Sequence, residues 1–137
     1  MKLNAFTDGA SRGNPGDAAI GIVIKSENGA TISTKKRYLG TATNNVAEYT
    51  ALVECIELVH SSETFNCTEL VVHTDSELMA RQLNGQYKVK DAGLKVLFNQ
   101  VKAALAGASF TFSIRHVPRS LNKEADALAN EAIDSKP

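Results

Sequence analysis

Residues 2–9 read Lys2-Leu3-Asn4-Ala5-Phe6-Thr7-Asp8-Gly9, a strand-like run that ends in an acid followed by a glycine. A second apolar run, at residues 70–74, ends at Asp75. In open α/β sheets, functional sites form beyond the carboxyl ends of the strands. Asp8 and Asp75 occupy such positions, so the pattern indicates a site if the fold brings these two ends together.

Hydrophobic periodicity around these runs predicts five strands and four helices. The strands are expected at residues 2–8, 18–24, 31–39, 69–74 and 110–115, and the helices at residues 45–60, 76–83, 91–106 and 121–134. A turn-rich loop is expected at residues 9–16 and a hairpin turn at residues 27–29. The order βββαβααβα predicts an α/β fold with a five-stranded mixed sheet, in which an antiparallel meander is followed by right-handed crossovers.

Three of these segments carry more specific expectations. The near-continuous apolar run at residues 18–24 is typical of a strand that is buried on both faces. The cations at residues 35–37 suit a strand at the edge of the sheet. The last helix is expected to bury its apolar positions, which are Leu121, Ala125, Leu128, Ala129, Ala132 and Ile133.

Length and composition favour one soluble domain spanning residues 1–137. The formal net charge is zero and the pI is about 6.8, so any polyanion must be bound by a local patch. The N-terminus lacks the apolar stretch of a signal peptide, and no run approaches the ~20 apolar residues of a transmembrane helix. Cys55 and Cys67 have no metal-binding spacing and are too few for a disulfide scaffold. We expect a cytoplasmic monomer with no membrane partner.

Two further acids, Glu48 and Asp126, lie near the starts of predicted helices. Glu48 shares a helical stripe with Leu52 and Ile56, so it is expected to face the sheet. Burying a carboxylate costs several kcal/mol unless the group is paired or coordinated. An all-carboxylate set suits Mg²⁺ or Mn²⁺ better than Zn²⁺, and four acids favour two ions and phosphoryl-transfer chemistry.

Each acid also has a purely structural interpretation. Asp8 could shape a turn. Asp75 could cap the helix that follows it, and Glu48 could complete a capping box with Asn45. Asp126 is harder to explain in this way, because aspartate is a poor helix former.

Four stretches of the chain resemble, in order, the motifs of the type 1 ribonuclease H family. They read TDGASRGNPG at residues 7–16, TNNVAEY at residues 43–49, TDS at residues 74–76 and HVPRSLNKEAD at residues 116–126. The likeness spans the whole chain, and the joint signature is highly specific. It implies a ribonuclease H-like fold and an endonuclease that cuts the RNA strand of RNA/DNA hybrids, leaving 5′-phosphate and 3′-hydroxyl ends.

The resemblance also implies catalysis by two ions, Mg²⁺ or Mn²⁺, bound to four acids. By motif matching, Asp8 would bridge both ions, and Asp126 would help to hold the ion that activates water. Glu48 and Asp75 would complete the other ion site. Glu48 would also contact a ribose 2′-hydroxyl beside the cut, which helps to explain RNA selectivity because only RNA carries this group.

Neutral residues near the motifs match substrate-binding positions of the family. Positions that read the minor groove and the 2′-hydroxyls match Asn14, Asn44 and Asn45, with Ser11 a weaker match, and Gly9 is a further substrate-binding candidate. Thr43 matches a position that grips a phosphate of the DNA strand. The alternative is that residues 14–16 form only a turn and that Thr43 or Asn45 is only a helix cap, although helix N-termini bind phosphate well.

The chain departs from many relatives because it lacks a basic, Trp-containing helix. It has no tryptophan, and residues 83–90 take the place of this element, so it resembles the compact, archaeal-like branch. Weaker and more salt-sensitive binding is expected. Arg81, Lys88, Lys90 and residues 35–37 are candidate phosphate contacts or simply solvated charges. Whether RNA duplexes are also cut is left open.

His116 and Arg119 compete for the role that the family gives to a mobile histidine in product release or proton transfer. His116 ends the inward alternation of the strand at residues 110–115, so it could instead be a packed strand-end histidine. Arg119 lies in the loop before Asp126, where the compact branch uses arginine, and we favour it.

The rival functions are a non-catalytic hybrid-binding module and the nuclease part of a polymerase-linked system. The four intact carboxylates favour an active enzyme.

Overall fold

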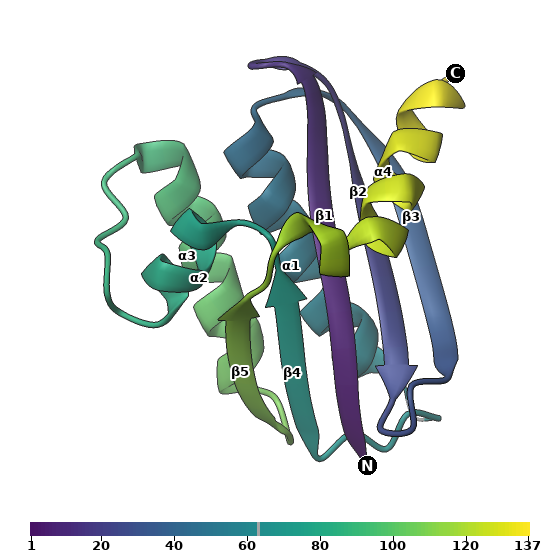
Figure 1. Cartoon of the computed structure of the whole chain (residues 1–137). Coiled ribbons are helices and arrows are strands. Elements are labelled where there is room, and N and C mark those ends of the chain that lie inside the picture. Colours follow the sequence, from purple (N-terminus) through teal and green to yellow (C-terminus); the bar gives the residue numbers. More distant parts are fainter. Residues whose placement is uncertain (63) are drawn as a thin grey trace.

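A computed structural model describes residues 1–62 and 64–137 and shows a five-stranded sheet between helices (Figure 1). The strands are β1 (Lys2–Gly13), β2 (Gly16–Ser26), β3 (Thr31–Ala42), β4 (Glu69–Thr74) and β5 (Thr111–His116). The helices are α1 (Asn44–Ser61), α2 (Glu77–Leu83), α3 (Ala92–Ala106) and α4 (Lys123–Asp134), with a short 3₁₀ helix, η1, at Arg119–Leu121. The sheet order is β3-β2-β1-β4-β5. Strand β2 pairs antiparallel with both β1 and β3, whereas β4 pairs parallel with both β1 and β5. The predicted α/β fold with a mixed sheet is confirmed.

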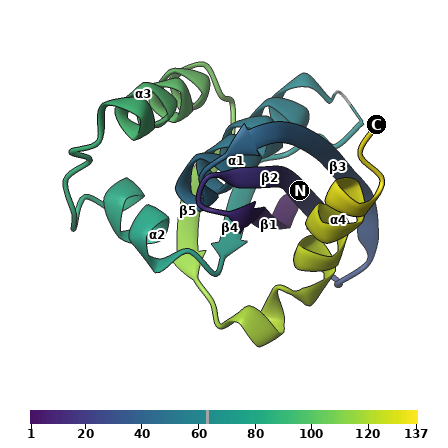
Figure 2. The ribbon, with the colours of Figure 1, turned by 90° about the horizontal axis from the view of Figure 1, so that it is seen from above.

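Helices α1 and α4 pack on opposite faces of the sheet (Figure 2). The larger core lies between the sheet, α1 and α3 and includes Leu3, Ile22 and Leu52. A smaller cluster joins β2 to α4. Because side chains alternate along a strand, residues next to each other in β1 face different helices. Asp8 pairs with Gly21, which lies beneath α4, so its side chain leaves the sheet on the α4 face.

Two glycines allow these helices to lie very close to the sheet. A Cβ atom on Gly9 would overlap the backbone nitrogen of Glu48, and a Cβ atom on Gly21 would overlap the carbonyl oxygen of Ala125. Each glycine therefore sets the position of a helix at the point where that helix carries, or adjoins, one of the four acids.

The first hairpin is longer than predicted, and the expected loop at residues 9–16 is wrong. Strands β1 and β2 stay paired as far as Gly13 and Gly16, so the connection contains only two residues. Antiparallel pairing satisfies the backbone along this stretch, and Gly13 supplies the left-handed conformation at its end, with φ 115°. Asp8 therefore lies within a continuous strand rather than at a turn.

The final helix starts later than predicted. Leu121 belongs to η1 and is 62% exposed, so its expected burial is wrong. The chain turns at Asn122, which is buried and donates a hydrogen bond from Nδ2 to the carbonyl oxygen of Thr7 at 2.9 Å. Of the other apolar positions, Leu128 is half-buried, whereas Ala125, Ala129, Ala132 and Ile133 are buried as expected.

The expectations for the other strands are confirmed. The apolar residues 18–24 are buried, and β3 is an edge strand. The β3 cations form ion pairs with both flanking helices, since Lys36 contacts Glu131 of α4 and Arg37 contacts Glu54 of α1. Cys55 is buried in the core as a free thiol. Within residues 1–62 and 64–137, no helix is both long and apolar enough to cross a membrane.

Candidate active site

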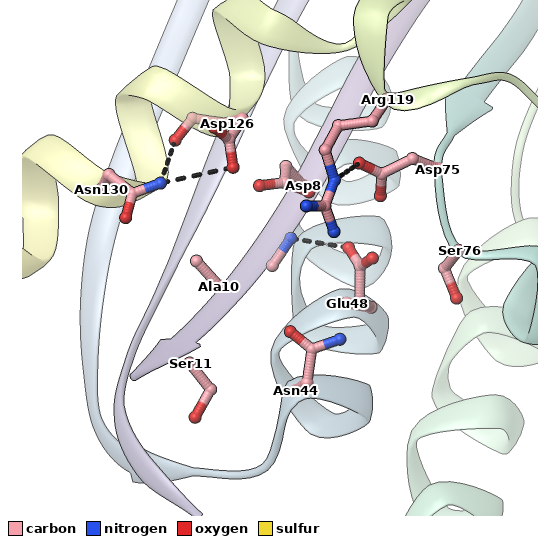
Figure 3. A pocket seen from close by; sticks show the side chains of 11 residues that line it. Asp8, Ala10, Ser11, Asn44, Glu48, Asp75, Ser76, Arg119, Asp126 and Asn130 are labelled. Carbon is pink, nitrogen blue, oxygen red and sulfur yellow. Dashed lines mark hydrogen bonds and ion pairs between the residues drawn. The ribbon is translucent and has the colours of Figure 1, made fainter. Parts of the chain in front are cut away.

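Four acids, from β1, α1, α4 and the turn after β4, line one cavity of about 300 Å³ (Figure 3). Asp8, Glu48 and Asp75 each place a carboxylate oxygen within 4.8 Å of the other two. Asp126 lines the same cavity from the first turn of α4. The parallel pairing of β1 with β4 joins Thr7 to Thr74, so the following residues, Asp8 and Asp75, become neighbours.

Local hydrogen bonding shows that these acids are not caps or turn residues. The N-cap of α2 is Ser76, whose hydroxyl accepts a hydrogen bond from the backbone nitrogen of Met79 at 3.2 Å. Thr43 caps α1 in the same way by accepting from Val46 at 3.2 Å. The structural interpretations of Asp75 and Glu48 as caps are therefore wrong, and both carboxylates are free to serve the cavity.

Glu48 is held by the backbone of the neighbouring strand. Its side chain is only 3% exposed, and Oε1 accepts a hydrogen bond from the backbone nitrogen of Gly9 at 2.6 Å. This contact turns the carboxylate toward β1 and Asp8, as expected from the apolar stripe that Glu48 shares with Leu52.

The cavity strongly favours the neutral form of two carboxyl groups. Burial, reinforced by the charges of Asp75 and Asp126, raises the pKa of Asp8 to about 8. Burial also raises the pKa of Glu48 well above its ordinary value, with further contributions from Asp8 and Asp75. Burial disfavours the charged form of each group, and the nearby like charges add to this effect.

One cation faces these acids among the described residues that line the cavity. Arg119 places Nε 3.9 Å from Oδ2 of Asp75, but its side chain is 87% exposed and reaches over the mouth (Figure 3). It therefore offsets the negative charge only in part. A compact set of carboxylate oxygens with too few cations suits a hard divalent ion, so the residues fit a metal site.

His116 lies outside this cavity. Its side chain is exposed at the end of β5, where it lines a separate hollow with Arg81, Asn84 and Gln86. The interpretation of His116 as a packed strand-end residue is wrong, because its side chain is exposed beside the polar side chains of this hollow.

The predicted substrate-binding residues fall into two groups. Gly9, Ser11 and Asn44 line the cavity. Asn14, Thr43 and Asn45 are not among the lining residues. Asn14 accepts a hydrogen bond at Oδ1 from the backbone nitrogen of Asn44 at 3.1 Å, and Thr43 caps α1, so both shape the start of that helix. Asn45 is exposed there.

The candidate phosphate contacts also fall into two groups, cations that are already paired and lysines that are exposed. Lys35, Lys36 and Arg37 are engaged in ion pairs along β3. Arg81 contacts Glu77 and lies over the Tyr87 ring. Lys88 and Lys90 are exposed in the segment between α2 and α3.

Sequence reasoning missed three residues that line the cavity, Ala10, Ser76 and Asn130. The signal for Asn130 is its spacing, because a residue four positions after Asp126 lies on the same helix face. Asn130 Nδ2 donates to the carbonyl oxygen of Asp126 at 3.0 Å and to its Oδ1 at 3.3 Å.

Comparisons with known proteins agree with this arrangement. Residues 6–132 match the family model described as "Reverse transcriptase-like". The chain is 41% identical to ribonuclease HI of Halobacterium salinarum, covering 97% of this chain and 65% of that protein. It is 39% identical to a bifunctional protein of Mycobacterium tuberculosis over 98% of this chain but only 36% of that protein. The chain thus spans less than two thirds of the curated relatives that it matches first.

Solved structures give the same answer. The crystal structure of RNase H1 from Halobacterium salinarum superposes with a TM-score of 0.91 at 40% identity, covering 99% of this chain and all of that one. LC11-RNase H1, solved in complex with an RNA/DNA hybrid, gives 0.91 at 42% identity over 96% of both chains. These likenesses confirm what the four motifs indicated: the chain belongs to the type 1 ribonuclease H family.

Proposed function

We propose that this chain is an endonuclease that hydrolyses the RNA strand of RNA/DNA hybrids and leaves 5′-phosphate and 3′-hydroxyl ends. The observation that carries the proposal is the group of Asp8, Glu48 and Asp75, whose oxygens lie within 4.8 Å of one another in an open cavity that Asp126 also lines. The complex of LC11-RNase H1 with an RNA/DNA hybrid supports the substrate class.

The four acids would hold two divalent cations, Mg²⁺ or Mn²⁺. When bound, such a pair of ions supplies an activated water and stabilises the leaving oxygen. Asp8 is the best candidate for the shared ligand, because its pKa responds to Asp75 and to Asp126. The pKa of Glu48 responds to Asp8 and Asp75. In Figure 3, Asp8 lies between Asp126 on one side and Glu48 and Asp75 on the other, and the carboxylates would act as ligands rather than as acid and base.

The polar residues beside the acids would position the substrate. Glu48, Asn44 and Ser11 line one wall of the cavity and would face the minor groove, where the 2′-hydroxyl distinguishes RNA from DNA. Asn14, Thr43 and Asn45 gather at the start of α1, and the positive end of the helix dipole there would favour a phosphate of the DNA strand.

Arg119 is the proposed catalytic helper. It lines the cavity, and its exposed guanidinium is free to reach a phosphate at the mouth. His116 lies in a different hollow, so we assign it no part in the reaction. We further propose that residues 1–137 act as one domain, since one sheet joins β1 near the start of the chain to β5 in its last third. A monomer in the cytoplasm is part of the same proposal.

The test uses labelled RNA/DNA hybrid, RNA duplex and DNA duplex, each with Mg²⁺ or Mn²⁺. Wild-type protein should cut the RNA strand of the hybrid, and Asp8→Asn should not. If wild-type protein leaves the hybrid intact with both ions but still binds it, the chain is a non-catalytic hybrid-binding module. The RNA duplex lanes decide whether that substrate is also cut.

A further inference from the structure

A row of polar side chains along α4 leads to Asp126. Asp126, Asn130 and Asp134 are spaced four residues apart, so they share one face of the helix. Arg12 of β1 lies against the same face. Its Nη1 is 2.7 Å from Oδ1 of Asp134, and its Nη2 donates to Oδ1 of Asn130 at 3.3 Å. The row thus connects an exposed ion pair to an acid of the cavity. Figure 3 shows its inner end, where Asn130 contacts Asp126.

The chemistry of these groups fixes the orientation of the Asn130 amide. A guanidinium only donates hydrogen bonds, so Arg12 requires the amide oxygen of Asn130 to face it. The amide nitrogen must then point toward Asp126, where it donates to Oδ1 at 3.3 Å and to the carbonyl oxygen at 3.0 Å. A carboxylate that accepts this bond with one oxygen keeps a defined rotamer.

We propose that Asn130 is a positioning residue for Asp126, and that Arg12 orients Asn130 for this task. This inference deepens the proposed function, on which it rests, because it assigns a control of metal affinity to residues that are not themselves ligands. The hydrogen-bond partners of metal ligands have this effect in general, and their loss weakens metal binding or activity about 10- to 100-fold.

The Arg12–Asp134 pair is exposed, with 47% and 63% of the two side chains accessible. Exposed ion pairs contribute little to stability. Removing the guanidinium of Arg12 should therefore change the orientation of Asn130 without changing the fold. This separates a positioning role from a purely structural one.

The experiment compares wild type with Asn130→Ala, Asn130→Leu and Arg12→Met, and uses Asn99→Ala on α3 as the matched control, since Asn99 is an exposed helical asparagine away from the cavity. Alanine and leucine are good helix formers, so α4 should remain intact. Asn130→Leu keeps a branched side chain of similar size but cannot donate a hydrogen bond. Arg12→Met removes the β1 donor to Asn130 and leaves the sequence of α4 unaltered.

Two readouts are recorded over a series of Mn²⁺ concentrations, the thermal midpoint of unfolding and the rate of hybrid hydrolysis. Both Asn130 variants should need about 10-fold more Mn²⁺ for half of the thermal shift and half of the rate, while the rate at saturating Mn²⁺ stays close to that of wild type. Arg12→Met should shift in the same direction by a smaller factor. Asn99→Ala should match wild type.

Two results would overturn the inference. One is an unchanged Mn²⁺ dependence in both Asn130 variants. The other is a loss of hydrolysis at every Mn²⁺ concentration with an unchanged thermal shift, which would make Asn130 a substrate contact. If wild-type protein never cuts the hybrid, the proposed function fails, and the thermal shifts alone decide whether Asn130 positions Asp126.

Discussion

The two sides of the cavity hold their acids by different means. On the α1 side, Glu48 is buried and accepts a hydrogen bond from the backbone of Gly9 at 2.6 Å. On the α4 side, Asp126 is half-buried and accepts its bond from the side chain of Asn130 at 3.3 Å. A backbone donor persists whatever residue replaces its neighbours, whereas a side-chain donor is lost with one substitution. The α4 side is therefore where substitutions can adjust the site without rebuilding it.

The largest expected effect comes from the acid that both sides share. Asp8→Asn keeps the size of the side chain but removes the charge that faces Asp75 and Asp126. We expect hybrid hydrolysis to fall at least about a thousandfold, which corresponds to about 4 kcal/mol of transition-state stabilisation. Initial rates on end-labelled hybrid with Mn²⁺ measure this loss. A variant that retained more than a tenth of the wild-type rate would rule out Asp8 as the shared ligand.

A substitution of Arg119 separates the contribution of the exposed mouth of the cavity, which affects turnover, from that of its buried acids, which bind metal. Arg119→Ala should slow turnover by about 100-fold, a typical contribution from a group that stabilises charge or moves a proton. The thermal shift caused by Mn²⁺ should stay the same, because Arg119 is not a metal ligand. His116→Ala is the matched control and should keep turnover near that of wild type. The assignment is reversed if the His116 variant is the slower of the two.

The close approach of α4 to the sheet can be broken at Gly21. A methyl group there would overlap the carbonyl oxygen of Ala125 and push α4, with Asp126, away from β2. We expect Gly21→Ala to lower the free energy of unfolding by about 1–3 kcal/mol, as overpacking does in other cores. Gly107→Ala is the control, since a Cβ atom there meets nothing within 4 Å. Equal urea midpoints for the two variants would show that this approach tolerates a side chain.

The metal-free protein should lose stability as the pH rises. The pKa of Asp8 is raised to about 8 in the folded state, so the folded chain binds a proton that the unfolded chain has already released above its ordinary pKa of 3.8. Between these values, each pH unit lowers the free energy of unfolding by up to about 1.4 kcal/mol for this group. Urea titrations at pH 5, 6, 7 and 8, in chelator, measure the slope. Asp8→Asn should make the slope less steep, while Glu48, whose pKa is also raised, should keep part of it. A wild-type stability that rose over this range would contradict the shift.

Most of the fold could be predicted because its signals are local. The periodicity of residues 69–74 and the apolar run at residues 18–24 are complete within each element, and both strands appear where expected. The extended hairpin at residues 9–16 could not be predicted, because the glycines there suit a turn, and only the pairing of β1 with β2 shows that these residues continue the strands. Leu121 was misplaced for a similar reason, since the start of α4 depends on the bond from Asn122 to Thr7, which is distant in sequence.

The chain by itself determined which chemistry is available. Four carboxylates at or near the ends of predicted elements, without Cys or His ligands beside them, favour hard divalent ions whatever the details of packing. Only the tertiary structure decided where each group lies. Ser76 and Thr43 take the capping positions and leave Asp75 and Glu48 free, while Arg119 rather than His116 reaches the cavity. These outcomes depend on hydrogen bonds and packing between residues far apart in the chain, and no local pattern records them.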